Sequence, residues 1–227
     1  MIRVYCNNLK NLNKWTKIWR LTAGKGVVHC DVPEYNESSR VRALQLWINL
    51  EKNNKMNDAK YQYLKNSNIP RKSCNGVHVK IIAGESMGIR SEIVETLTPT
   101  YYLDFKLEKN AEFTQPLPAD YNSFVFILEG SGIFGKMKTV VASKGDTLIF
   151  TLGDSVNFKN ENNEQLHFIL LAGKMLNEPI ARGGPFVMNT HEEIQQARYD
   201  YKNGKNGFEN APNWLSTEMK RRMNSSN

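Results

Sequence analysis

The amino-acid sequence predicts an all-β protein, a sandwich or a barrel, and three observations lead to that prediction. Short stretches of strand length recur along the chain, and they are rich in β-branched and aromatic residues. Glycine, asparagine, aspartate and proline stand between these stretches, as turns require. Only two stretches have helical character, which is too few for a fold of alternating β and α units. The strands are expected at residues 43–50, 76–84, 100–107, 123–130, 146–150 and 166–173.

Alternation of apolar and polar residues identifies the first of these strands. In the stretch ALQLWINL, Leu44, Leu46 and Ile48 fall on one face, and Gln45 and Asn49 fall on the other. The later stretches are more continuously apolar and end at turn residues, which is typical of strands inside a sandwich or barrel.

Two stretches are predicted to be helical. Residues 58–70 are short and polar and stop at Pro70. Further along, Thr190 and Glu193 have the spacing of a capping box, and Gly204 lies just past the apolar positions. A helix is therefore expected at residues 190–204.

The stretch GSGIFG, residues 130–135, matches the glycine pattern of dinucleotide-binding proteins and follows a strand. A dinucleotide site would also need a helix to begin there. The following residues predict a strand, a Gly-Asp turn and another strand instead. The glycines are better explained by a hairpin turn that needs positive φ.

Composition excludes several classes of protein. The chain of 227 residues has no apolar run of membrane-spanning length and no apolar core near Met1 that would indicate a secretion signal. Three widely spaced cysteines fit a reducing intracellular compartment. The net charge of +7 is spread out, and its longest cluster, residues 220–222, is explained by a solvated helix end. Direct binding to nucleic acid is therefore not expected, and neither is a membrane location.

His29 and Asp31 are the candidate site residues, because a histidine and a carboxylate stand two positions apart after a short apolar run. On an extended strand both side chains would point to the same side. They could ligate a metal or form a structural hydrogen-bonded pair, and the spacing leaves both readings open. His167 shares a face with Ile169 and Leu171, which favours a hydrogen-bonded histidine in the core. His191 is expected to be exposed.

Several stretches resemble the pirin family in register, from about Trp19 to about Trp214. The most specific is GPFVMNTHEEIQQARYDYKNGKNGFE, and it is accompanied by LTAGKGVVHCDVP, LQLWINL, GVHVKIIAGESMGI and TPTYYLDFKL. The resemblance implies two cupin barrels in tandem, of which the first binds one iron and the second binds none. The expected domains are residues 1–98 and residues 99–227 with the helix.

In the family, two histidines of an H-x-H strand and a later histidine and carboxylate hold the iron. The later pair corresponds to His29 and Asp31, with aspartate in place of the usual glutamate. Residues 1–18 contain no histidine and do not resemble the family. The first barrel is therefore expected to be incomplete at its N-terminal end, with weak or absent iron binding.

The resemblance implies a redox-sensitive transcription co-regulator in the nucleus and cytoplasm, which binds iron as Fe(II) or Fe(III) and contacts Rel-type transcription-factor complexes as a monomer. It also implies an alternative, an iron-dependent quercetin 2,3-dioxygenase that uses a flavonol and O₂. In that reaction Asp31 would be catalytic, taking the flavonol proton. A third reading is a truncated, metal-deficient and inactive product.

Overall fold

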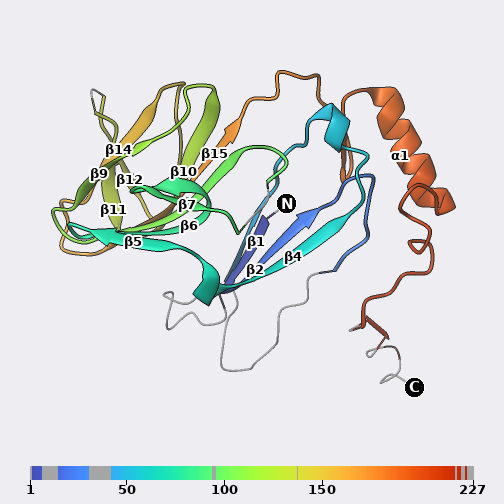
Figure 1. Ribbon diagram of the computed structural model, residues 1–227, viewed down its shortest axis with the longest axis horizontal. Coiled ribbons are helices and arrows are strands. Elements are labelled where there is room, and N and C mark those ends of the chain that lie inside the picture. The colour runs from blue at the N-terminus through green and yellow to red at the C-terminus, as the bar shows by residue number, and fades with distance from the viewer. Residues whose placement is uncertain are drawn as a thin grey trace. The chain divides into compact units, whose positions relative to one another are not determined.

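The computed structural model describes residues 2–6, 15–30, 42–93, 96–136, 138–217, 219, 220 and 223. Strands dominate this part of the chain and α1, His191–Asn203, follows them, as Figure 1 shows. The predicted all-β cupin class with a C-terminal helix is confirmed. No helix among the described residues is both long and apolar enough to cross a membrane.

The chain folds into two compact units whose limits differ from the expected boundary at residue 98. Unit 1 contains residues 1–66 and 177–227, and unit 2 contains residues 67–176. Strand pairing explains the difference, because β6, Val77–Ser86, pairs with β8, Thr100–Leu107. Residues on both sides of position 98 therefore belong to one sheet.

Unit 1 is built on a four-stranded antiparallel sheet with the order β3-β1-β2-β4. Ile18 lies opposite Leu64 in this sheet, and both are buried. Leu44 and Leu46 are half-buried. The strands are β1, Ile2–Cys6; β2, Trp15–Thr22; β3, Arg42–Leu46; and β4, Lys60–Lys65.

The prediction of a helix at residues 58–70 is wrong. Strand β4 occupies the middle of this stretch, and the short 3₁₀ turn η2, Asn66–Asn68, follows it. The residues alternate between an exposed face with Tyr61 and Tyr63 and a face with buried Leu64. This period of two suits a strand, and pairing with β2 decides in its favour over the local preference for a helix.

Unit 2 contains two sheets with a shared apolar core. One has the order β13-β10-β15-β8-β6-β5, with β7 paired to β6, and the other has the order β12-β11-β14-β9. Rings of Phe105, Phe134, Phe158 and Phe168 pack together in the core and are at most 1% exposed. The other strands of unit 2 are β5, Arg71–Cys74; β7, Ile89–Ser91; β9, Glu112–Pro116; β10, Tyr121–Glu129; β11, Ser131–Phe134; β12, Val140–Ser143; β13, Thr147–Ile149; β14, Ser155–Lys159; and β15, Leu166–Lys174.

The stretch GSGIFG is not followed by a helix. Gly130 and Gly135 have φ of +71° and +95° and lie at the two ends of β11. Strand β12, the turn at Gly145 and strand β13 come next. The glycines thus serve turns, as predicted, although the residues between them form a strand of their own.

The predicted caps of α1 are both present. The Thr190 side chain accepts from the backbone N–H of Glu193, whose carboxylate accepts from the backbone N–H of Thr190. Gly204, with φ of +62°, ends the helix in the left-handed region.

Removal of the N-cap is expected to destabilise the protein moderately. Thr190→Ala should lower the free energy of unfolding by about 1 kcal/mol, because the N–H of Glu193 loses its acceptor. Urea denaturation measures the change. Thr151→Ala, at an exposed position outside helices and strands, is the control, and equal losses in both variants would contradict the role of the cap.

Candidate functional site

The turn before His29 is fixed to the segment before β4. The backbone N–H of Lys25 donates to the carbonyl oxygen of Asn57 over 2.9 Å. Lys25 Nζ lies 2.6 Å from Asp58 Oδ1. The hydrogen bond and the opposite charge raise the pKa of Lys25 and lower the pKa of Asp58.

Phe208 packs against the same turn from the C-terminal part of unit 1. Its side chain is buried, and a methyl group added at Gly26 would overlap its ring. The Phe208 ring also lies edge-on to those of Phe186 and Tyr201, with centroids 6.0 and 5.4 Å away. The segment that follows α1 therefore holds the turn that leads to His29.

A partly buried polar cluster lies before α1, in the part of unit 1 that leads to the helix. Glu178 Oε2 accepts from the backbone N–H of Lys52 over 2.9 Å and from Asn189 Nδ2 over 3.1 Å. The Lys55 side chain is buried nearby and donates to Asn49 Oδ1 over 2.6 Å. Burial lowers the pKa of Lys55, although nearby carboxylates oppose the shift. Distant parts of the sequence are thus joined within unit 1.

The strand expected to carry His29 and Asp31 is not present in the described part. Residues 26–30 lie outside any strand, and His29 is half-buried. Asp31 lies outside the described residues, so the structure does not test the predicted pair. Iron needs three or four protein ligands, and no group of three or more His, Cys, Asp and Glu residues in the described ranges could hold a metal ion. Those residues alone do not fit an iron site.

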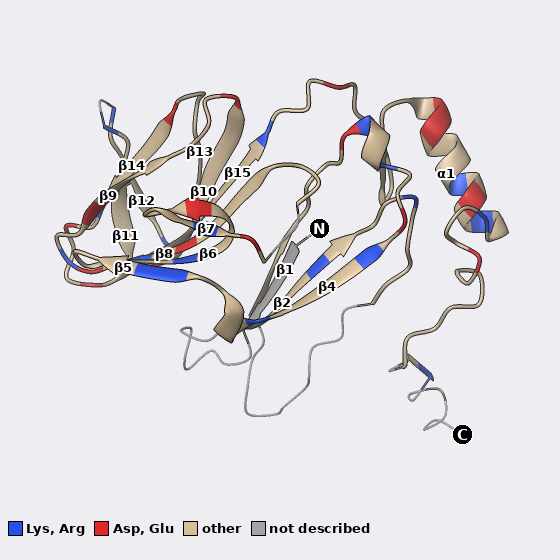
Figure 2. Ribbon diagram, viewed as in Figure 1, with Lys and Arg blue, Asp and Glu red and all other residues tan. Residues whose placement is uncertain are grey.

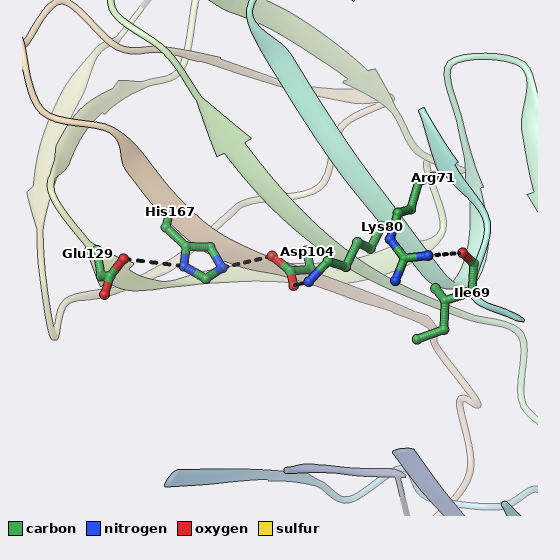
Figure 3. Close-up of polar contacts among 6 residues, drawn as sticks. All are labelled: Ile69, Arg71, Lys80, Asp104, Glu129 and His167. Carbon is green, nitrogen blue, oxygen red and sulfur yellow. Dashed lines mark hydrogen bonds and ion pairs between the residues drawn. The ribbon is translucent and has the colours of Figure 1, made fainter. Parts of the chain in front are cut away.

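Unit 2 contains a row of ionisable side chains, buried at its centre, that crosses four neighbouring strands and is drawn in Figure 3. Asp104 on β8 lies between His167 on β15 and Lys80 on β6, with Oδ1 2.8 Å from His167 Nε2 and Oδ2 3.4 Å from Lys80 Nζ. Glu129 on β10 continues the row, with Oε2 3.8 Å from His167 Nδ1. His167 is therefore a hydrogen-bonded core histidine, the reading that its sequence position favours.

The charges around Asp104 decide its protonation. Burial by itself would raise the pKa of Asp104, but the hydrogen bond and charge of His167 and the charges of Lys80 and Lys106 outweigh it. The pKa of Asp104 therefore lies below its ordinary value of 3.8. Burial and this carboxylate together raise the pKa of Tyr102. The row consists of paired charges that tie strands together, which suits a structural role.

The sequence alone did not reveal this row, because its members are far apart in the chain. Asp104 and His167 are 63 positions apart. The one local signal was an aspartate inside the otherwise apolar start of TYYLDFKL. A carboxylate at such a position is buried and needs a cationic partner, but the sequence does not say which one.

The other two histidines lie elsewhere. The ring of His78 on β6 lies between Ser73 Oγ, 2.8 Å from Nδ1, and Glu108 Oε1, 3.1 Å from Nε2. These contacts are exposed to solvent. His191 is the exposed first residue of α1, as expected.

The family model and the curated relatives that match this chain indicate one family. The model of the pirin C-terminal cupin domain matches residues 102–207. Pirin of Homo sapiens is 41% identical over 213 residues, which are 93% of this chain and 72% of that protein. A pirin-like protein of Solanum lycopersicum is 43% identical over 196 residues, 86% of this chain and 66% of that protein. A crystal structure of quercetin 2,3-dioxygenase from Acinetobacter baumannii has a TM-score of 0.74 and 30% identity, and the match covers 91% of this chain and 73% of that one.

Proposed function

This chain belongs to the pirin family, and from that premise we propose that it acts as a transcription co-regulator in the nucleus and cytoplasm, where it contacts Rel-type transcription-factor complexes as a monomer. The observation that supports this proposal is the 41% identity to human pirin across 93% of the chain. Co-regulation requires a folded surface that binds the partner and does not require catalysis. Both units can therefore contribute to it.

His29 and Asp31 would supply part of the ligand set for a bound iron. A one-electron redox change is the chemistry that iron would supply there. His29 follows the turn that Lys25 and Phe208 hold. The remaining donors would have to lie outside the described residues.

A pull-down with a purified Rel-family complex tests this function. The full chain is immobilised after treatment with a chelator, with Fe(II), or with Fe(II) followed by oxidation. We expect capture of the complex, with an amount that depends on the oxidation state. Equal capture with and without metal and in both oxidation states would reject the redox switch. Absence of capture in every state would reject the co-regulator function.

Replacement of His29 is expected to remove the iron that the chain retains. Elemental analysis of the chain after iron loading and desalting should show a several-fold lower content in His29→Ala, because an imidazole is one of few ligands there. His191→Ala removes an exposed histidine at the start of α1 and is the matched control. Equal iron in the two variants would reject His29 as a ligand.

The second candidate function is oxygen-dependent opening of a flavonol ring. The 30% identity to the Acinetobacter quercetin 2,3-dioxygenase, at a TM-score of 0.74, favours it. Bound iron would supply the oxygen chemistry, and Asp31 would take the proton of the flavonol hydroxyl group.

Quercetin absorbance separates the two functions. Fe(II) and quercetin are mixed with the chain without oxygen, and oxygen is then admitted. Loss of flavonol absorbance that Asp31→Asn slows would support the dioxygenase, and no loss would remove it. A chain that neither captures the Rel-family complex nor consumes quercetin would be the inactive product.

A further inference from the structure

The charged residues in the strands of the unit 1 sheet are all basic. Its four strands contain no aspartate or glutamate, whereas each has at least one basic residue. Figure 2 shows blue segments and no red ones on β2 and β4. The basic residues are Arg3, Lys17, Arg20, Arg42, Lys60 and Lys65. Arg20 is buried, and Lys60 and Lys65 are exposed.

Three aromatic side chains lie exposed on one face of this sheet. Trp19 on β2 is directly opposite Tyr63 on β4, and their ring centroids are 4.8 Å apart. Tyr61 lies two positions before Tyr63 and therefore on the same face. Trp19, Tyr63 and Tyr61 are 40%, 44% and 53% exposed. Lys65, two positions after Tyr63, adds a cation to this aromatic face.

We propose that this aromatic face binds single-stranded nucleic acid. Exposed rings on a sheet offer surfaces on which unpaired bases stack, and Lys65 beside them would neutralise a phosphate. A duplex hides the faces of its bases inside the helix and gains little from the rings. An acidic peptide would satisfy the charge but would leave the rings without planar partners. The combination of rings and cations therefore favours a flexible polyanion that carries bases.

The sequence alone did not indicate this surface, because the rings come from two strands far apart in the chain. Trp19 and Tyr63 meet through the pairing of β2 with β4. The site thus exists only in the folded sheet.

Fluorescence anisotropy of a labelled oligothymidine of about 15 nucleotides tests the proposal on the full chain. Trp19→Ala and Tyr63→Ala should each weaken binding about tenfold, because each removes a stacking surface. Lys65→Gln should lower the slope of log affinity against log salt concentration by about 0.7, the contribution of one phosphate contact. Tyr199→Ala removes a tyrosine of similar exposure, 51%, from α1 and should bind like the parent chain.

Three results would overturn the proposal. The first is that the parent and Trp19→Ala chains bind oligothymidine with equal affinity and that heparin displaces the oligothymidine completely. This result would indicate binding by charge attraction alone. The second is tighter binding of duplex DNA than of oligothymidine. The third is binding of polyglutamate, but not of oligothymidine, that depends on the same rings. Circular dichroism confirms folding of each variant, and Tyr61→Ala replaces Trp19→Ala if the latter is unfolded.

Discussion

Replacement of Asp104 by alanine is expected to lower the free energy of unfolding by about 3–5 kcal/mol. The carboxylate is 2% exposed and lies between His167 and Lys80. Its removal leaves the His167 imidazole and the Lys80 ammonium group without their shared carboxylate partner in a largely buried site, which costs more than loss of the contacts themselves. Urea denaturation of the full chain measures the change.

Asp120→Ala is the matched control for this prediction. Asp120 is an exposed aspartate just before β10 in the same unit, and its loss should change the free energy of unfolding by less than about 0.5 kcal/mol. Similar changes in the two variants would contradict a stabilising role for the buried row.

The contribution of Asp104 should also depend on pH. Its folded pKa lies below the ordinary value of 3.8, so the ionised carboxylate contributes stability that is present above that pH. This stability is lost as pH falls through the folded value. The difference in unfolding free energy between the parent and Asp104→Asn should therefore be constant at neutral pH and shrink in acid. A difference that grows in acid would show that another group controls it.

Replacement of Phe208 by alanine is expected to lower the free energy of unfolding by about 3–5 kcal/mol. Phe208 is 3% exposed and packs against Gly26 and the rings of Phe186 and Tyr201. The cavity would remove the contact that holds the turn before His29. We therefore also expect faster proteolytic cleavage near Lys25 in this variant, because local opening exposes the backbone.

Trp47→Ala is the control for Phe208→Ala. Trp47 is a larger aromatic residue in the same unit but is 61% exposed, so its removal leaves no cavity and should cost less than about 1 kcal/mol. Unchanged cleavage near Lys25 in Phe208→Ala would show that the C-terminal segment does not hold the turn.

Features that depend on neighbouring residues were predictable from the sequence. The N-cap Thr190 and the C-cap Gly204 act within one turn of α1, and both are present as predicted. Strands β8 and β15 were expected at 100–107 and 166–173, and they are observed at Thr100–Leu107 and Leu166–Lys174. Their apolar runs suit a core strand whatever partner lies beside it.

Features that depend on distant residues were not predictable. The polar stretch around Tyr61 and Tyr63 resembled a short helix until its pairing with β2 made it a strand. The row through Asp104 and His167 needs two strands to meet. The metal pair of His29 and Asp31 stays a prediction, because Asp31 lies outside the described residues.

The sequence by itself determined the all-β class, the capped helix and the pirin family, because periodicity, capping and motif spacing are properties of contiguous residues. Only the tertiary structure decided how the strands divide between two units, which charges are buried together and which rings remain exposed. Strand pairing and burial join residues tens of positions apart, and no local pattern specifies their partners.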